Sequence, residues 1–243
     1  MRYFLEVSYK GTRYNGFQIQ DTGATIQGEI EKAWATLFKE TVLLTGSSRT
    51  DSGVHALQNF FHFDWDQTFN SKWLYNLNAI LPADIVIKDV TRVADDAHSR
   101  FDALSRRYAY KVYQFKNAFL SDTAYFYPYP LDLEAMNRAA SLIKDFNDFS
   151  SFSKKNTQVK TFQCHLMESY WEQEKELFIY HVTANRFLRG MVRALVATML
   201  RVGRQTLSME AFEAIIKKAV CGTAWFDAPA RGLTLEQVVY PVE

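Results

Sequence analysis

Apolar and polar positions follow two different periods in the first part of the chain. Alternation every second residue is typical of a strand, and a spacing of three or four residues is typical of a helix with one buried face. This pattern predicts the order strand, helix, strand, strand, helix, strand, with Thr25 and Ser71 as helix N-caps. The predicted strands cover residues 3–9, 41–45, 56–65 and 84–93, and the predicted helices cover residues 25–39 and 72–80.

The second part of the chain repeats this order without residue-level similarity. Strands are predicted at residues 105–115, 162–171, 177–183 and 235–240, and helices at residues 133–144, 186–202 and 209–220. Two successive βαββαβ units are typical of two ferredoxin-like halves, each a helix-backed and mainly antiparallel sheet. We therefore predict an α+β fold with an N-terminal half at residues 1–103 and a C-terminal half at residues 104–243. A substrate cleft is expected between the halves.

The connection at residues 46–56 carries an unusual number of chemically versatile side chains. Arg49, Thr50, Asp51 and His55 lie there among two glycines and three serines. Polar loops held between strands commonly display functional groups. Asp, Ser and Gly are also ordinary turn formers. The residues alone therefore support a structural turn and a functional loop equally.

Basic residues gather in the segment at residues 185–208, which holds five arginines and no acidic residue. One unbroken helix would place them all on one side: Arg186, Arg189, Arg193, Arg201 and Arg204. Both a solvated charged face and an anion-binding face fit this pattern. A second basic cluster at residues 100–111 is interleaved with Tyr108 and Tyr110, a combination that suits RNA. Tyr110 is interpreted as a core residue with a hydrogen-bonded hydroxyl.

Composition narrows the class of protein only partly. Hydrophobic residues make up 48% of the chain and charged residues 23%, as in ordinary globular proteins. The net charge is only +1, so any phosphate binding must depend on local grouping of Lys and Arg. Cys164 and Cys221 lack the spacing of a metal site, so no metal centre is expected. Neither a basic-then-apolar leader nor a run of about 20 apolar residues occurs, so we expect a cytoplasmic protein without membrane association.

Six dispersed stretches carry specific motifs. The loop reads Arg-Thr-Asp-Ser-Gly-Val-His-Ala at residues 49–56. The other stretches are Tyr-Lys-Gly-Thr and Gly-Phe-Gln-Ile-Gln at residues 9–12 and 16–20, Arg-Tyr-Ala-Tyr at 107–110, Phe-Leu-Arg-Gly-Met-Val-Arg at 187–193, and Ala-Pro-Ala-Arg-Gly-Leu-Thr-Leu at 228–235. Taken in their order along the chain, these motifs resemble those of the tRNA pseudouridine synthase A family. The resemblance covers essentially the whole chain. Lys10, Phe17, Ser48, Ser52 and Ala197 depart from the family's usual residues, and none of them removes a group that the chemistry needs.

The resemblance implies the pseudouridine synthase fold, with a central RNA-binding cleft, and roles for individual residues. Asp51 would be the catalytic nucleophile, Arg193 its ion-pair partner, and Tyr108 the base or a ring that stacks on the uracil. His55 belongs to the motif without an assignable chemical step, so a structural role is expected. Further substrate contacts are expected from Arg49, which would hold a flipped nucleotide, from Leu233 at the uracil pocket, and from Arg186 and Arg189 in the basic segment.

The implied activity is that of an isomerase, a tRNA pseudouridine synthase that acts at positions 38, 39 and 40 of the anticodon stem-loop. Moving the base from N1 to C5 involves no redox change and no hydrolysis, so no cofactor is expected. The implied partners are tRNA and a second copy in a homodimer. Two alternatives stay open: a pseudouridine synthase for another RNA or tRNA position, and a non-catalytic RNA-binding protein. The loop lacks the Gly-x-Ser-x-Gly nucleophile elbow, which disfavours a hydrolase.

Overall fold

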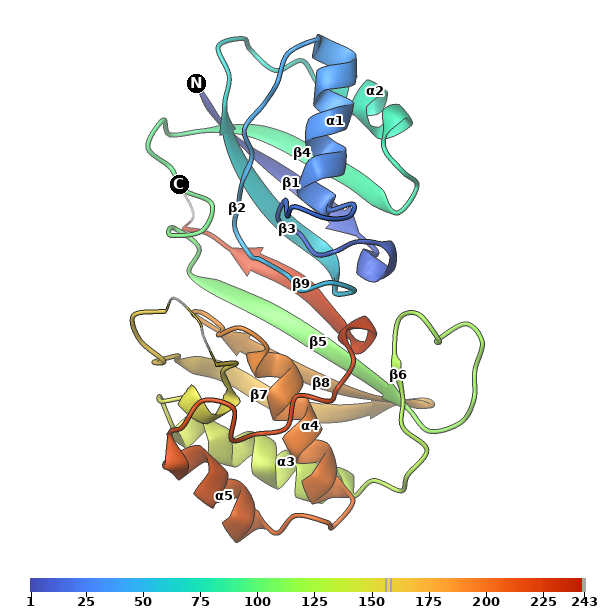
Figure 1. The fold of residues 1–243 in the computed structure, drawn as a ribbon, viewed down its shortest axis with the longest axis vertical. Helices are drawn as coiled ribbons and strands as arrows, with labels where there is room; N and C mark the ends of the chain where they lie inside the picture. Colours follow the sequence, from blue (N-terminus) through green and yellow to red (C-terminus); the bar gives the residue numbers. More distant parts are fainter. Residues whose placement is uncertain (156, 158, 242–243) are drawn as a thin grey trace. The chain divides into compact units, whose positions relative to one another are not determined.

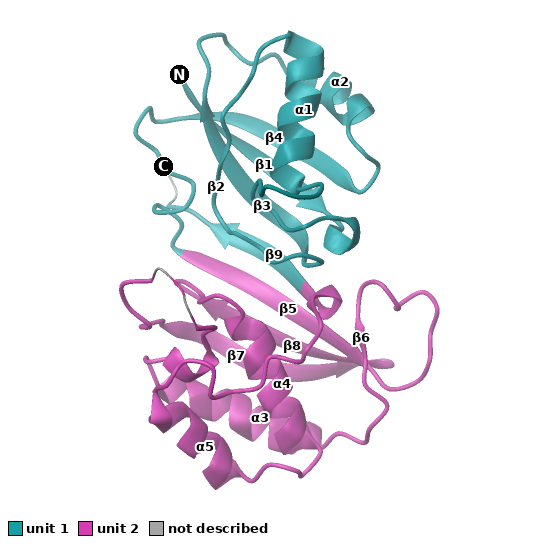
Figure 2. Ribbon diagram, in the orientation of Figure 1, with its two compact units in different colours: residues 1–104, 234–243 teal, residues 105–233 magenta. Residues whose placement is uncertain are grey.

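The computed structural model describes residues 1–155, 157 and 159–241, which form an α+β protein as the pattern predicts. Its helices and strands divide between two compact units (Figures 1 and 2). Unit 1 comprises Met1–Leu104 and Thr234–Glu243, and unit 2 comprises Ser105–Leu233. The predicted boundary between two domains, at residues 103 and 104, stays a prediction. The final strand, from Thr234 onward, belongs to unit 1.

Unit 1 has an antiparallel sheet with β1 (Arg2–Tyr9) between β4 (Ile85–Val93) and β3 (His55–Asp64). The free edge of β3 accepts two further strands. The short β2 (Thr45–Gly46) pairs antiparallel near one end, and β9 (Leu233–Val239) pairs parallel at His55 and Ala56. The helices α1 (Ile26–Phe38) and α2 (Lys72–Ile80) lie together over one face of this sheet (Figure 1).

The core of unit 1 forms where the alternating side chains of the strands meet α1. Trp34 of α1 is fully buried and packs edge-on against Phe63 and Trp65, with ring centroids 4.9 and 5.0 Å apart. Thr25 caps α1 as predicted, because its side-chain oxygen accepts a hydrogen bond of 3.1 Å from the Gly28 amide. Ser71 precedes α2 at the expected place but makes no side-chain capping bond.

Unit 2 is built on β8 (Leu177–Ala184), which pairs antiparallel with β5 (Ser105–Tyr113) on one side and with β7 (Leu166–Glu174) on the other. The two-residue β6 (Tyr125–Phe126) adds to β5 in parallel. The helices α3 (Leu133–Leu142), α4 (Met191–Gly203) and α5 (Met209–Lys218) pack together, and α3 contacts β7. Asp132 and Ser208 cap α3 and α5 through their side chains.

Three elements begin four or five residues later than predicted. Residues 41–44 do not join the sheet, because the backbone of Leu44 bonds instead to the side chains of Glu31 and Gln27 at 3.2 and 2.9 Å. The strand predicted from residue 162 begins only at Leu166. The helix predicted from residue 186 begins at Met191, because Gly190 adopts a φ of 75° in the left-handed region and interrupts it.

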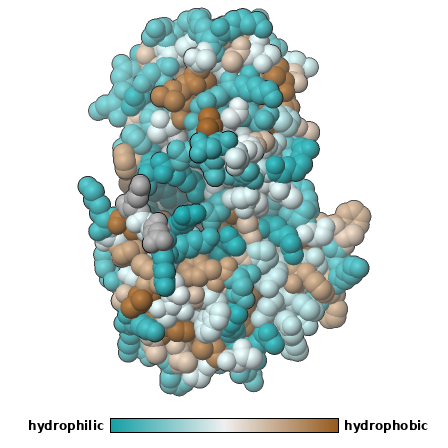
Figure 3. Space-filling model, in the orientation of Figure 1, coloured by the Kyte–Doolittle hydropathy of each residue, from teal (hydrophilic) through white to brown (hydrophobic). Residues whose placement is uncertain are grey.

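Surface and burial follow ordinary rules for a globular chain. Apolar residues occur in small groups among hydrophilic ones on the face shown in Figure 3. Among the described residues, no helix combines the length and the apolar character needed to cross a membrane.

The buried His62 of unit 1 predicts how stability responds to acid. Burial, with the nearby charges of His98 and Arg2, lowers the pKa of His62 from 6.5 to about 4. An unfolded chain therefore takes up a proton near pH 6.5 that the folded chain resists until about pH 4. The stability present above this window is lost as the pH falls through it. We expect about 2 kcal/mol of lost unfolding free energy between pH 7 and pH 5.

The variant His62→Gln should flatten this dependence in denaturant titrations at several pH values. The exposed His165 of unit 2 offers a control, and His165→Gln should leave the wild-type slope unchanged. An unaltered slope in His62→Gln would contradict the assignment.

Candidate active site

The loop between β2 and β3 presents Arg49 and Asp51 on a short, strongly held turn. The Ser47 amide donates to the Phe60 carbonyl at 2.8 Å, and the Val54 amide donates to the Asp51 carbonyl at 3.1 Å. Arg49 is exposed and Asp51 is half-buried. The loop therefore offers both side chains from a backbone that is bonded at both ends.

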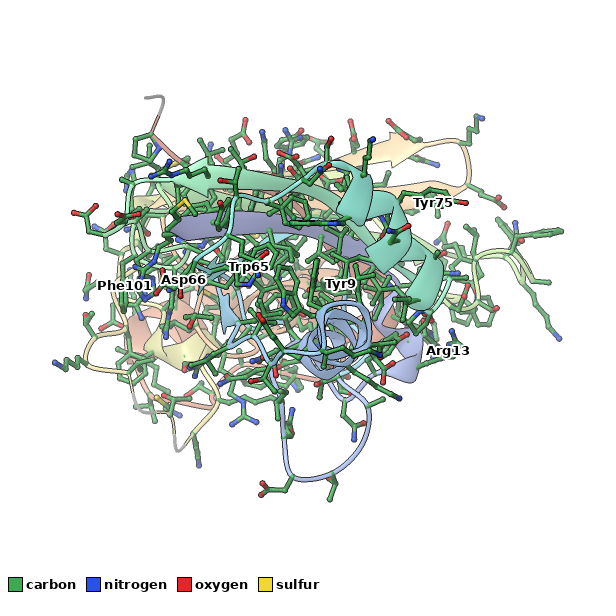
Figure 4. The ribbon with its side chains drawn as sticks, turned by 90° about the horizontal axis from the view of Figure 1, so that it is seen from above. Tyr9, Arg13, Trp65, Asp66, Tyr75 and Phe101 are labelled. Atoms are coloured by element: carbon green, nitrogen blue, oxygen red, sulfur yellow. The ribbon has the colours of Figure 1, made fainter. Side chains whose placement is uncertain are left out.

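A buried polar network holds the middle of this loop from below. Asn59 of β3 is fully buried, and its amide nitrogen donates to the Ser48 carbonyl at 2.9 Å and to the Tyr9 hydroxyl at 3.1 Å. The Tyr9 hydroxyl shares a hydrogen bond of 2.8 Å with the Thr50 hydroxyl. Tyr9 itself lies inside unit 1, whereas Arg13 lies at the surface (Figure 4). The residues on both sides of Arg49 are thus fixed by β1 and β3.

The two N-terminal motifs close around the same loop. The Phe17 amide donates to the Thr50 carbonyl at 3.2 Å, and the Phe17 ring stacks on Phe61 with centroids 4.2 Å apart. Position 11 has room only for glycine, because a Cβ there would lie 1.9 Å from the Val54 carbonyl oxygen. The Gly11 amide donates to Nδ1 of the buried His55 at 3.1 Å. This contact gives His55 a structural role, as expected.

In unit 2, three further motifs meet at the segment Ala228–Leu233. Arg193, in the first turn of α4, donates from Nε to the Ala228 carbonyl at 2.7 Å. The fully buried Tyr110 donates to the Pro229 carbonyl at 2.7 Å, and burial raises the pKa of its hydroxyl. A Cβ on Gly232 would lie 2.6 Å from the Tyr110 ring. The interpretation of Tyr110 as a core residue with a bonded hydroxyl is confirmed.

Tyr108 and Leu233 occupy buried places in the same unit. Tyr108 is 9% exposed, and its ring meets the edge of Phe187 at a centroid distance of 5.0 Å. Leu233 is 6% exposed at the start of β9. The strand motif, the arginine motif and the C-terminal motif therefore form one cluster of contacts within unit 2.

The expected one-sided stripe of five arginines is wrong. Arg186 and Arg189 precede α4, since the helix begins at Met191. Arg201 forms a two-pronged ion pair with Asp227 at 2.8 and 3.2 Å and lies over the Trp225 ring. Arg204 lies over the Tyr129 ring, 3.7 Å from its centroid. Asp227 follows the basic segment only much later in the chain, so local charge counting could not find it.

The predicted site residues divide between the two units. Arg49 and Asp51 belong to unit 1, and Tyr108, Arg186, Arg189, Arg193 and Leu233 belong to unit 2. The predicted ion pair of Asp51 with Arg193 stays a prediction. Within the described part of the chain, no three His, Cys, Asp or Glu side chains are grouped as metal ligands.

Comparison with known proteins gives a family match for most of this chain. The family model described as tRNA pseudouridine synthase matches residues 6–102 and 146–241. The chain belongs to this family. Asp51 and Arg193 fall within the matched ranges, and Tyr108 falls between them.

The similarity to relatives extends over more than nine-tenths of their length. The tRNA pseudouridine synthase A of Parabacteroides distasonis is 41% identical, over 100% of this chain and 97% of its own. The protein of the same name from Bacteroides fragilis is 42% identical with the same coverage. That of Staphylococcus aureus strain MRSA252 is 40% identical, over 98% of this chain and 91% of its own.

The polar network beneath the loop predicts that two tyrosine variants of β1 both lose stability but differ in activity. Removing the Tyr9 hydroxyl in Tyr9→Phe leaves Thr50 and Asn59 with a lost partner, which should cost about 1–2 kcal/mol of unfolding free energy. Because the loop loosens, the turnover number on the proposed tRNA substrate should also fall about tenfold or more.

Tyr3→Phe is the matched control on the same strand. The Tyr3 hydroxyl donates to the Gln67 carbonyl at 3.0 Å, away from the loop, so this variant should lose stability but keep its turnover number. Equal turnover numbers in the two variants would contradict a positioning role for Tyr9.

Proposed function

We propose that this protein isomerises uridine to pseudouridine in tRNA, at positions 38, 39 and 40 of the anticodon stem-loop. The observation that carries this proposal is similarity of about 40% identity to tRNA pseudouridine synthase A proteins along essentially the full chain. The contacts of the Asp51 loop support it, because every N-terminal motif packs against that loop.

The reaction conserves all atoms of the nucleotide. The bond from N1 to C1′ breaks, the base turns, and a new bond forms from C5 to C1′. A proton leaves C5, and N1 gains one. No electron acceptor and no water molecule enters the balance, so the chemistry calls for no cofactor.

Asp51 is the proposed nucleophile. Its carboxylate would attack the nucleotide, at either C1′ or C6, and hold one fragment while the base turns. The loop geometry suits this role because a half-buried carboxylate on a bonded turn loses little freedom when the substrate arrives. Arg193 would keep the carboxylate ionised, and Tyr108 would remove the C5 proton or stack on the uracil.

Arg49 is proposed to stabilise the nucleotide after it leaves the stem. A base in a stem must leave its stack before its glycosidic bond can be reached. Arg49 is exposed two residues before Asp51, so its guanidinium is available to a neighbouring phosphate or to the vacated stack. We also propose that the protein is cytoplasmic and forms a homodimer. Sedimentation of the purified protein would test the dimer.

Pseudouridine mapping of tRNA from cells with and without the gene tests the activity and its positions together. Loss of pseudouridine at positions 38–40 supports the proposal, and unchanged modification there contradicts it. Loss at other positions would favour the alternative substrate.

Asp51→Asn should abolish pseudouridine formation, by at least about a thousandfold, because an amide is no substitute for the carboxylate nucleophile. Binding of tRNA should stay within about twofold. The measurement is single-turnover modification of a tRNA transcript, together with filter binding. Asp66→Asn, at an exposed position of the same unit, is the control and should react normally. An active Asp51→Asn enzyme would overturn the mechanism.

Arg193→Gln should lower the turnover number about a hundredfold while KM changes little, because the lost cation acts on the reacting carboxylate. Arg201→Gln is the control on the same helix, since Arg201 already pairs with Asp227. It should reduce thermal stability and leave the turnover number in place. A loss confined to KM in Arg193→Gln would contradict the proposed ion pair and indicate an RNA contact.

A further inference from the structure

Two groups of basic residues in unit 2 differ in their surroundings, and the sequence does not distinguish them. Arg201 and Arg204 are engaged by Asp227 and Tyr129. Lys154, Lys155 and Arg189 form a second group, and among the described residues none of these three makes an ion pair. We call these three residues the lysine cluster. Its charge is therefore not neutralised by neighbouring carboxylates.

Backbone hydrogen bonds join the segments that carry the lysine cluster. The Lys154 amide donates to the Arg189 carbonyl at 3.1 Å. The Gly222 amide donates to the Ser153 carbonyl at 3.0 Å, and the Ala224 amide donates to the Ser151 carbonyl at 3.0 Å. Ser151 and Ser153 are fully buried. The cluster thus stands on a fixed backbone of three connected segments.

Two glycines make room for the lysine side chains. A Cβ on Gly190 would lie 3.3 Å from two carbons of the Lys154 side chain, and a Cβ on Gly222 would lie 3.1 Å from Cε of Lys155. Both glycines have positive φ values, of 75° and 76°. Long side chains that lie along a surface keep their ammonium groups in water. The glycines therefore leave room for two lysine stems, of which Lys155 is exposed and Lys154 half-buried.

The three sequence stretches that carry the cluster and its backbone partners hold no acidic residue between their ends, although Asp148 and Asp227 border them. Residues 149–167, 177–209 and 214–226 contain no Asp and no Glu. The first turn of α4 follows Gly190 directly, and a helix N-terminus adds a partial positive charge. Lys154, Lys155 and Arg189 therefore form a local group of positive charge, although the chain as a whole has a net charge of only +1.

We propose that the lysine cluster is a phosphate-binding site that holds the sugar-phosphate backbone of the tRNA substrate. The inference rests on the proposed function for the identity of the RNA. It assigns positioning, and no chemical step, to Lys154 and Lys155. Phosphate contacts of this kind set the register of a nucleic acid on a protein without reading its bases.

The test measures tRNA binding at several salt concentrations with the variant Lys154→Gln/Lys155→Gln. Each lost phosphate contact lowers the slope of log K against log salt by roughly 0.7–0.9. We expect the slope to fall by between about one and two, affinity to fall about tenfold at low salt, and the turnover number to stay near the wild-type value.

Lys144→Gln/Lys175→Gln is the matched control, because it removes the same charge from exposed lysines of unit 2 that adjoin acidic residues. Its slope should equal that of the wild type. Lys154→Arg/Lys155→Arg keeps both positive charges and should retain the wild-type slope. This variant tests whether the lower slope of Lys154→Gln/Lys155→Gln results from the lost charge. Equal slopes in the two Gln variants, or loss of binding in the Arg variant, would overturn the proposal.

Binding is measured without turnover, so this result is independent of the activity. A wild-type protein that binds tRNA but leaves it unmodified would defeat the proposed function alone. A modifying enzyme with an unchanged slope in Lys154→Gln/Lys155→Gln would defeat the lysine cluster alone.

Discussion

The Asp51 loop depends on one buried side chain, the carboxamide of Asn59. It bonds the Ser48 carbonyl and the Tyr9 hydroxyl, and so connects β1 and β3 to the loop that precedes β3. A buried polar group that loses its partner costs about 1–3 kcal/mol, so the network favours a single loop conformation. Rigid placement of a reacting group lowers the entropy cost of reaching the transition state. The loop is therefore part of the sheet's core as much as of its surface.

Unit 2 uses a comparable arrangement around the Tyr110 hydroxyl. This buried group bonds the Pro229 carbonyl, and Gly232 allows the chain to pass close to its ring. Arg193 bonds the neighbouring Ala228 carbonyl, so a helix and a strand hold the same segment. In each unit, buried polar contacts bring together motifs that are far apart in the sequence. Dispersed motifs of this kind are thus explained by packing within each unit.

Local sequence signals predicted most of the fold and the content of the loop. The Thr25 cap and the alternation of β1 are short-range features, and the structure has them where expected. The limits of the prediction come from interactions over longer range. Side chains of α1 hold Leu44 away from the sheet, and Asp227 neutralises Arg201 from outside the basic segment. Gly190 was visible in the sequence, but a single glycine does not by itself say that a helix starts after it.

The order of strands along the chain differs from their order in unit 1. β9 pairs with β3 at His55 and Ala56, immediately after the Asp51 loop, and Val238 also bonds Gln58 at 3.0 Å. On the ribosome, this edge of β3 is made early, whereas its partner emerges only after all of unit 2. Until then the edge exposes unpaired backbone groups that can attract other chains. A nascent chain therefore completes the surroundings of the Asp51 loop only after β9 has been made.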